Sequence, residues 1–375
     1  MAHPVRRFTK RFIIFCNLIT VVFFLLGCYG YLLNPATFWI TGFFALASFY
    51  FLLILIGFIF FWLIAKPVYS LISIVALLLA WTPLRNLVKL RVTHDFEMKK
   101  DSTSLRVMSW NVEHFEILLH KKHPEKKQQM LWLINSYQPD VACFQEMVGS
   151  DSVPKAINYL PDFVRDLKMP YFYYTYNSKL DFDQDHRFGI IIFSKYPIIN
   201  KKSISYSPNN YNSIFQYIDI LKGPDTFRVF NLHLQSLKFS DDELQYLEEP
   251  TMQEESKLKR SRNILSKFKT GFLKRKEQSE HIKAAIDESP YPVIVCGDFN
   301  DVPNSYAYAT IGKGLLNSFA EKGSGIGRTY SHISPTLRID NIFTDKRFTI
   351  EQYVRIGKSV SDHFPIVADI YYNKP

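Results

Sequence analysis

The chain has 375 residues and a formal net charge of +10, and its length suits one large domain or two ordinary ones. The charge is uneven. Residues 1–94 hold eight Lys or Arg and no acidic residue, which leaves 37 of the 45 basic residues to face all 35 acidic residues in the remainder. Net charge is therefore no evidence for nucleic-acid binding. The four cysteines have neither the spacing of a zinc site nor that of a disulfide framework.

The N-terminal segment has the composition of membrane-spanning helices. Residues 12–33 contain no charged side chain and follow a basic run, and at about 1.5 Å per residue they match the roughly 30 Å hydrocarbon core. Residues 38–81 contain a single charge, Lys66, and are too long for one span. We therefore predict a membrane region over residues 1–92 with three transmembrane helices, at about 12–33, 38–64 and 68–88.

The orientation of this region follows from its basic residues. The basic N-terminus is expected in the cytoplasm, because cytoplasmic flanks carry the excess of Lys and Arg. Three spans place the rest of the chain outside the cytoplasm, which is the side we predict, whereas two spans would place it inside. Arg85, Lys89 and Arg91 oppose the outer placement. Residues 1–28 also resemble a signal peptide, but the apolar segments that follow favour an ordinary membrane helix.

A polar linker over residues 93–104 precedes a change of pattern. Short β-rich runs then alternate with amphipathic stretches, and several runs are apolar on both faces. This pattern predicts an α/β (α+β) domain over residues 105–375, with central sheets covered by helices. The expected strands lie at 105–111, 140–145, 188–194, 214–220, 226–232, 292–297, 338–343 and 365–371, and the expected helices at 124–137 and 256–288.

A charged insertion over residues 236–283 interrupts this pattern. Residues 241–255 contain seven acids and no base, and residues 257–283 contain ten Lys or Arg against two acids. Apolar residues recur in the basic part at helical spacing, from Ile264 to Leu273. We favour a surface helix with a solvated basic face. The alternative is a helix that lies against anionic lipid or a phosphate-rich polymer.

Polar side chains that suit metal binding or proton transfer follow the expected strands in six places. Taken singly, such an Asp is often a turn or helix cap, and a lone His is usually a satisfied structural group. Asp301, which precedes Val302 and Pro303, is interpreted as a turn residue. The repetition elsewhere predicts that the other side chains form one site. They are Asn111, Glu113, Glu146, His233, Asp298, Asn300, Asp340, Asp362 and His363.

The residue types in this set indicate one kind of chemistry. Carboxylate and amide oxygens are ligands of hard cations, so we expect Mg²⁺, or else Mn²⁺ or Ca²⁺, and the lack of a Cys/His cluster disfavours zinc. Histidines beside carboxylates transfer protons near neutral pH. Together they suit metal-assisted attack of water on a phosphate ester. The sequence has no Gly-x-x-x-x-Gly-Lys loop and no Gly-x-Ser-x-Gly elbow.

Seven motifs resemble, in order and chemistry, those of the endonuclease/exonuclease/phosphatase superfamily. This superfamily includes deoxyribonuclease I, exonuclease III-type repair nucleases, neutral sphingomyelinases and inositol-polyphosphate 5-phosphatases. The motifs are SWNVEHF, DVACFQEM, GIIIFSKYPI, NLHL, GDFNDVP, RIDNIF and SDHFPIVADI, and they cover about residues 105–372. The resemblance implies a four-layer α/β/β/α sandwich with its site where the strand ends converge. It also implies a divalent metal ion and a phosphoester substrate.

The resemblance implies a set of metal ligands. Glu146 is similar to the principal metal carboxylate of the family, with Asn111 and Asp362 nearby. Glu113 stands where some relatives use an Asp as an additional ligand. Nuclease relatives usually have a Tyr or an acidic residue between the Glu and the NLHL motif, which has no match here. Arg187 lies in that region, either as a phosphate contact or as a surface ion-pair partner.

The resemblance also implies catalytic roles. Asp298 would orient or deprotonate the attacking water, and Asn300 would hold the phosphate. His363, held by Asp340, would bind and polarise a phosphate oxygen. His233 would be a second histidine facing the phosphate and a possible general acid. Either Asp298 or His363 could be the general base.

The substrate is less constrained than the reaction, because a fold does not determine it. We favour a membrane-anchored nuclease-type phosphodiesterase, for which the basic part of the insertion could supply cationic residues. A sphingomyelinase-like lipid phosphodiesterase and a small-molecule phosphatase are the alternatives. The aromatic stretch 171–182 reads either as an apolar hairpin for membrane entry or as an ordinary strand. A fourth hypothesis, an inactive membrane-tethered binding module, conflicts with the full set of candidate site residues. The expected partners are thus a nucleic acid or lipid headgroup and, through the N-terminal helices, the bilayer.

Overall fold

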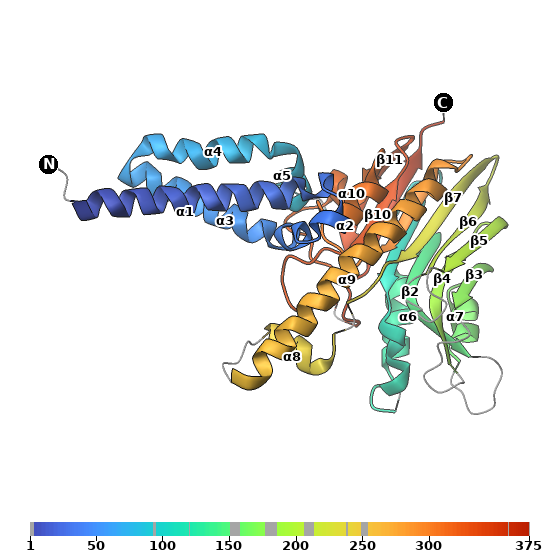
Figure 1. Ribbon diagram of the computed structural model, residues 1–375. Helices are drawn as coiled ribbons and strands as arrows, with labels where there is room; N and C mark the ends of the chain where they lie inside the picture. The colour runs from blue at the N-terminus through green and yellow to red at the C-terminus, as the bar shows by residue number, and fades with distance from the viewer. Residues whose placement is uncertain are drawn as a thin grey trace.

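The computed structural model of the chain describes residues 4–92, 95–119, 121–150, 158–176, 186–205, 214–237, 239–248, 254–358 and 360–374. An elongated helical bundle at the N-terminus extends away from a body of two β-sheets and their covering helices (Figure 1). The bundle consists of α1 (Pro4–Tyr29), α2 (Pro35–Phe38), α3 (Thr41–Ala65), α4 (Ser70–Leu79) and α5 (Trp81–Leu87).

Two of these helices are long and apolar enough to cross a membrane. They are the segment Pro4–Leu32, which contains α1, and Thr41–Ala65, which is α3. Both coincide with the first two predicted spans. In Figure 1 they run side by side in opposite directions, so the N-terminus and the α3–α4 turn lie at the end of the bundle remote from the sheets.

The third predicted span, 68–88, is not the single straight helix that we expected. The segments Pro67–Leu79 and Trp81–Leu87 meet at an angle of 76°, so they count as a third span only if the bent pair is taken as one. Pro83 provides a physical reason, because a proline has no N–H to donate to the carbonyl four residues earlier. That carbonyl, on Leu79, instead accepts a hydrogen bond of 2.6 Å from the hydroxyl of Tyr29.

The body contains two six-stranded sheets. The first has the order β11-β12-β1-β2-β4-β3 and the second has the order β5-β6-β7-β8-β10-β9. The first sheet comprises β1 (Leu105–Asn111), β2 (Val141–Ser150), β3 (Tyr171–Tyr176), β4 (His186–Ser194), β11 (Phe348–Arg355) and β12 (Ile366–Tyr372). The second comprises β5 (Ile198–Ser205), β6 (Ile214–Lys222), β7 (Asp225–His233), β8 (Val293–Asp298), β9 (Leu316–Asn317) and β10 (Asp340–Thr344).

Helices cover the outer faces of both sheets. The first sheet packs against α6 (Lys126–Tyr137) and α7 (Leu160–Asp166). The second packs against α9 (Glu254–Asp287) and α10 (Tyr306–Gly312). A third apolar core lies between the sheets and includes the buried Cys143 and Cys296. This arrangement confirms the predicted four-layer α/β/β/α sandwich.

The observed strands extend or add to the predicted ones at several places. Strand β2 continues to Ser150, five residues beyond its expected end. Strands β5, β9 and β11 were not predicted. Residues Tyr171–Tyr176 form the ordinary edge strand β3, which is one of the two interpretations of the aromatic stretch. Residues 177–182 of that stretch lie outside the described residues.

The insertion forms two helices, α8 (Asp241–Glu248) and the 34-residue α9, which is about 50 Å long. The C-terminal part of α9 buries Ile282 and Ile286 against the second sheet. The middle of α9 packs on the bundle, where the ring of Phe43 in α3 lies 4.9 Å from that of Phe268 and 5.5 Å from that of Phe272. The apolar stripe of α9 is therefore partly covered by α3. We had predicted a surface helix and had not predicted this contact.

Polar contacts also join the bundle to the body. The hydroxyl of Tyr50 in α3 lies 2.8 Å from that of Ser334. Asn304 donates to the carbonyl of Pro83 at 2.9 Å and accepts from the Asn86 side chain at 3.0 Å. The guanidinium of Arg338 donates to the carbonyl of Asn86. Together with the aromatic contacts, these bonds hold α3 and α5 against the second sheet.

Candidate active site

Three candidate residues form one row across the second sheet. His233 ends β7, Asp298 ends β8 and Asp340 begins β10, and the strand register places His233 beside Asp298 and Asp298 beside Asp340. Gly297 keeps this row compact. Its φ is +151°, and a Cβ atom at this position would lie 2.1 Å from the carbonyl oxygen of Leu232, so no larger residue fits.

The first sheet supplies Asn111 and Glu146 from parallel neighbours. Asn111 ends β1 and pairs in register with Gln145 of β2. The register of β2 shifts between Phe144 and Met147, so Glu146 lies in a β-bulge, where its φ is +54°. Bulges redirect side chains at the edges of sheets. This one turns Glu146 toward Asn111 instead of leaving it in the regular alternation of the strand.

A buried polar network joins the two sheets below the site. The amide of Gln145 donates to the Asn231 side chain at 2.7 Å. Asn231 in turn donates to the carbonyls of Phe144 at 3.0 Å and Ile191 at 2.8 Å. Buried hydrogen bonds of this kind hold the groups they join in fixed positions, although the side-chain oxygen of Gln145 has no partner among the described residues. The network fixes the separation of the sheets immediately behind Glu146.

Asn111 lies at the centre of the carboxylate cluster. Its amide nitrogen donates to Glu146 at 3.3 Å and to Asp298 at 3.1 Å. Its oxygen accepts from the backbone N–H of Glu113 at 3.1 Å. The carboxylate of Glu113 accepts from the backbone N–H of Asp362 at 3.1 Å. Direct metal ligation by Asn111 would therefore require the opposite orientation of its amide.

The carboxylates of this cluster crowd one another. Burial, followed by the nearby charge of Asp362, raises the pKa of Glu146 to about 8 and that of Glu113 to about 7. Burial also raises the pKa of Asp298, and Asp340 adds to this effect. Oxygen donors that repel one another in this way are the donor set of a hard divalent cation, which would offset the repulsion. The residues thus fit the expected ion.

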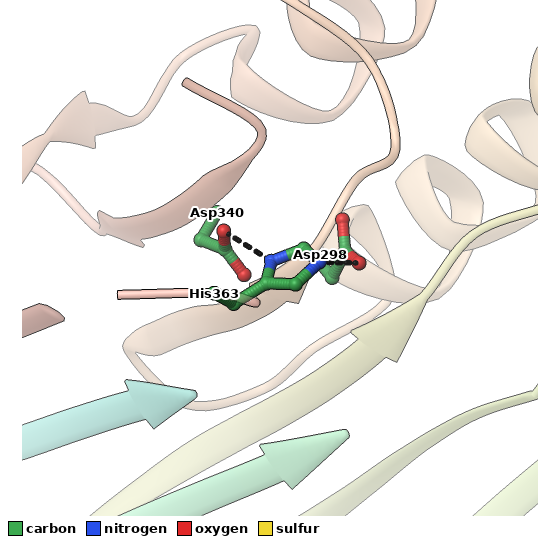
Figure 2. A group of neighbouring side chains, drawn as sticks. All are labelled: Asp298, Asp340 and His363. Carbon is green, nitrogen blue, oxygen red and sulfur yellow. Dashed lines mark hydrogen bonds and ion pairs between the residues drawn. The ribbon is translucent and has the colours of Figure 1, made fainter. Parts of the chain in front are cut away.

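His363 and Asp340 form a buried pair. The Nδ1 of His363 lies 2.9 Å from a carboxylate oxygen of Asp340, and its Nε2 lies 3.7 Å from Asp298. Figure 2 shows the imidazole between these two carboxylates. Burial opposes the charged imidazole, but Asp340, Asp298 and Asp362 outweigh it and raise the pKa of His363 well above its usual value. The hydroxyl of Thr329 accepts from the backbone N–H of Asp340 and holds that strand end in place.

The same three residues offer a second possible position for a cation. Ligand atoms of Asp298, Asp340 and His363 lie within 4.8 Å of one another, and all three residues are buried. The Nδ1 of His363 already has Asp340 as its hydrogen-bond partner, however. The group of Glu113, Glu146 and Asp362 has more carboxylate oxygens and no imidazole, but the ligand atoms of these three described residues do not all lie within 4.8 Å of one another.

His233 and Asn300 complete the set of nine predicted residues. The Nε2 of His233 lies 3.7 Å from Glu146 and 3.6 Å from Asp298. The backbone N–H of Asn300 donates to Asp298 at 2.7 Å, and its side chain donates to the carbonyl of Leu234 at 3.1 Å. Asn300 has a φ of +50°, a left-handed conformation that asparagine tolerates better than most residues. The structure therefore brings all nine residues into one cluster.

Two further residues belong to the cluster and were not predicted. The Nε2 of His114 lies 3.3 Å from Glu146, and burial lowers the pKa of His114 to about 4. Its place directly after Glu113 in the sequence was an available signal. The ring of Tyr330 lies 4.9 Å from that of His363, and burial, followed by the charge of Asp362, raises the pKa of Tyr330. Tyr330 lies in a loop without any motif, so the sequence carried no signal for it.

Asp301 has a larger role than the predicted turn residue. Its carboxylate does accept from the N–H of Val302 at 3.0 Å, as a turn residue would. It is also buried, and it forms an ion pair of 3.2 Å with Arg275 of α9. Asp301 thus attaches the insertion to the strand end that carries Asp298. Arg187 lies in β4 and is absent from the described residues that line the site cavity.

The cluster opens into a cavity of about 560 Å³. Its polar wall contains the candidate site residues Asn111, Glu146, Asp298, Asn300, Asp362 and His363, together with Tyr330. Its remaining walls come from α3, from the insertion and from residues 333–339. A volume in this range accommodates a ligand of small-molecule size.

The chain belongs to the endonuclease/exonuclease/phosphatase family, whose model matches residues 108–363. Members of this family are generally phosphoester hydrolases that depend on divalent metals. Residues 10–87 match the model of a domain of unknown function, DUF8431. A search of curated proteins finds no match.

Several solved structures are similar to this chain at low sequence identity. A family member from Bacteroides thetaiotaomicron is 17% identical with a TM-score of 0.52, and the alignment covers 73% of this chain and 100% of that one. A member from Beutenbergia cavernae DSM 12333 is 16% identical with a TM-score of 0.49 and 72% coverage of each chain. D. rerio TDP2, complexed with a single-strand DNA product, is 18% identical with a TM-score of 0.48. The alignment covers 72% of this chain and 99% of the TDP2 chain.

Proposed function

We propose that this protein is a divalent-metal-dependent phosphodiesterase anchored in a membrane. The observation that carries the proposal is the buried His363–Asp340 pair facing the crowded carboxylates of Asp298, Glu146 and Asp362 in one cavity. A protonated imidazole would stabilise the negative charge of a bound phosphate. The carboxylates opposite it would bind a cation and position the water that attacks phosphorus.

The metal ligands proposed are Glu146, Asp362 and Glu113, with Asn111 as a ligand or as the group that orients Glu146. When bound, a Mg²⁺, Mn²⁺ or Ca²⁺ ion would neutralise charge on the phosphate and bring a water molecule close to phosphorus. His114 lies 3.3 Å from Glu146 and is positioned to orient that carboxylate.

The proton transfers are assigned to the row in the second sheet. Asp298 is the proposed general base, because the N–H of Asn300 and the amide of Asn111 hold its two oxygens in place. His363 is held in its protonated form by Asp340 and would donate to a phosphate oxygen, so it is poorly suited to accept the proton of water. His233 is a second candidate hydrogen-bond donor to the phosphate. Asn300 is a third, and its side chain is uncharged.

Metal removal tests this proposal. Full-length protein in detergent should hydrolyse methyl p-nitrophenyl phosphate in the presence of Mg²⁺ or Mn²⁺, and EDTA should abolish at least about 99% of the rate. Adding back the metal in excess should restore it. Hydrolysis that is unchanged by prolonged chelation would contradict the proposal. So would the absence of hydrolysis with Mg²⁺, with Mn²⁺ and with Ca²⁺ alike.

A nuclease of the same mechanism is the second candidate. The feature that favours it is the basic character of α9, on which Arg262, Lys269 and Lys274 are exposed. This helix also contributes Phe268 and Arg275 to the cavity. Cleavage of single-stranded DNA with a steep loss of rate as salt is raised would support a nuclease.

We also propose that the sheets lie outside the cytoplasm. Lys10 and Lys66 both approach the ring of Tyr69, at 5.8 Å and 5.4 Å, so the basic N-terminus and the α3–α4 turn share the end remote from the sheets (Figure 1). Basic residues concentrate on the cytoplasmic side. At the opposite end, the backbone of Lys89 pairs with that of Gly325, which ties this basic segment to the body.

Thiol labelling tests the orientation. An Asn263→Cys variant on the exposed face of α9 should react with a membrane-impermeant maleimide in intact cells. A Thr9→Cys variant, at the exposed start of α1, should react only after the cells are permeabilised. The reverse pattern would place the sheets in the cytoplasm. The native cysteines give little background, because three are buried and Cys16 lies in an apolar helix.

A further inference from the structure

The site cavity has a polar side and a much larger apolar side. The polar side holds the proposed catalytic residues, and the apolar side has no role in the phosphoester chemistry proposed above. Apolar side chains reach it from three segments that are far apart in the sequence. Among them are Leu46 and Ala47 of α3, Phe239 and Leu244 of the insertion, and Ile333 and Leu337 of the loop before β10.

One of these walls is a candidate membrane helix. Helix α3 has 25 residues, or about 37 Å, against a hydrocarbon core of roughly 30 Å. Ala47 lies six residues after Thr41, so it is about 9 Å along the helix from the end nearest the sheets. A roughly 30 Å hydrocarbon core centred on this helix would begin about 4 Å from that end, so Ala47 would lie about 5 Å inside the edge of the hydrocarbon. A lipid in that leaflet would then have the first part of its hydrocarbon beside this wall.

The wall is fixed to the body and is not a chance contact. The rings of Phe43 and Phe268 pack at 4.9 Å, and the hydroxyls of Tyr50 and Ser334 lie 2.8 Å apart. Ala45, between these two contacts, packs with Val302 and Ile339 beside the strand ends of the site. Helix α3 is therefore held on both sides of the position at which Ala47 faces the cavity.

The cavity is poor in cations. Arg275 is the single Lys or Arg among the described residues that line it. The guanidinium of Arg275 is already engaged by Asp301 at 3.2 Å and by the carbonyl of Gln235 at 2.9 Å. A polyanion would need several cationic contacts to its backbone phosphates. The lining therefore suits a single phosphate that carries a hydrocarbon better than it suits a nucleic acid.

We infer that the substrate is a membrane lipid with a phosphodiester, whose hydrocarbon occupies the apolar side of the cavity against α3 while its phosphate faces Asp298 and His363. This inference rests on the proposed phosphodiesterase activity. In the reaction, the oxygen of water forms a bond to phosphorus and one P–O ester bond breaks. One proton of water passes to Asp298, and the departing alkoxide takes up a proton. Helix α3 is then part of the substrate site as well as an anchor.

Two esters with the same leaving group isolate the contribution of the substrate's hydrocarbon to the rate. Methyl p-nitrophenyl phosphate and hexadecyl p-nitrophenyl phosphate share the scissile bond and differ only in hydrocarbon. Full-length protein in detergent should show a kcat/KM for the hexadecyl ester at least about 100-fold higher, since burial of only four methylenes corresponds to a factor of this order. Equal kcat/KM values for the two esters would overturn the inference and leave the phosphodiesterase proposal intact.

A detergent micelle could concentrate the hexadecyl ester and raise its rate without any binding in the cavity. A cavity-filling variant distinguishes this effect from binding in the cavity. Ala47→Trp should lower the hexadecyl-to-methyl ratio of kcat/KM at least tenfold, because the indole would occupy the apolar side. Ala65→Trp makes the same substitution at the exposed far end of α3 and should keep the wild-type ratio. An unchanged ratio in Ala47→Trp would overturn the inference.

Two further outcomes are decisive. If Ala47→Trp does not fold, as judged by its thermal unfolding, Leu244→Trp places the same bulk on the opposite wall and should lower the ratio in the same way. Single-stranded DNA cleaved by the wild type with a higher kcat/KM than the hexadecyl ester would assign the site to a nuclease and overturn the lipid inference. If the wild type hydrolyses neither ester, the proposed phosphodiesterase function itself is contradicted.

Discussion

Asp298→Asn is expected to lower kcat about 10²–10⁴-fold while the protein remains folded. The substitution keeps the shape of the side chain but removes the group proposed to accept the proton of water, and general-base catalysis contributes a factor of this size. Asp298 is buried at the end of β8, and hydrogen bonds from Asn300 and Asn111 hold its two oxygens in place. The measurement is the rate of methyl p-nitrophenyl phosphate hydrolysis at saturating metal.

Asp287→Asn is the matched control for this variant. Asp287 ends α9, is largely exposed and pairs with Lys283, far from any proposed role in the reaction. Its rate should stay within about twofold of the wild type, because a surface ion pair contributes little. If Asp298→Asn retains more than a tenth of the wild-type kcat, another group is the base and the role assigned to Asp298 is wrong.

Glu146→Gln is expected to abolish the stabilisation of the protein by divalent metal. A ligand present at 100 times its dissociation constant stabilises the folded state by about 2.7 kcal/mol. The temperature of thermal unfolding of the wild type should therefore shift upward with Mg²⁺ or Mn²⁺, and the shift should be lost when the side chain of Glu146, a proposed metal ligand, is made neutral. This readout does not depend on turnover.

Without metal, the same variant should be more stable than the wild type at alkaline pH. The pKa of Glu146 is raised to about 8 by burial and by Asp362, so the folded state binds its proton more tightly than the unfolded state does. The carboxylate therefore costs stability, and this cost increases from about pH 4.5 to about pH 8. The advantage of Glu146→Gln should be small near pH 4 and largest above pH 8.

Glu288→Gln serves as the control for both effects, because Glu288 is exposed beyond the end of α9. It should keep the wild-type response to metal and the wild-type pH dependence of stability. A metal-induced shift in Glu146→Gln equal to that of the wild type would place the cation elsewhere. The alternative position is the group of Asp298, Asp340 and His363, which His363→Ala would then disrupt.

The strand pattern by itself predicted central sheets covered by helices, and the polar strand ends predicted the cluster of nine residues. The four layers were implied by the resemblance of the motifs to a known superfamily. Apolar strands with polar side chains at their ends are local patterns, and the ends of neighbouring strands meet at one edge of a sheet. His233, Asp298 and Asp340 therefore had to lie together once their strands were paired. The spans of α1 and α3 were equally readable, since a run of apolar residues of membrane length needs no partner to be recognised.

Only the tertiary structure decided which parts of the chain complete the cavity. The contact between Tyr50 and Ser334 joins residues 284 positions apart, and the packing of Phe43 on Phe268 joins the apolar helix α3 to the insertion. Neither pair leaves a periodic signal. The same is true of Asp301, whose partner Arg275 lies on a distant helix. Contacts of this kind depend on how separate elements pack, so the apolar wall that α3 adds to the site was invisible until the chain was folded.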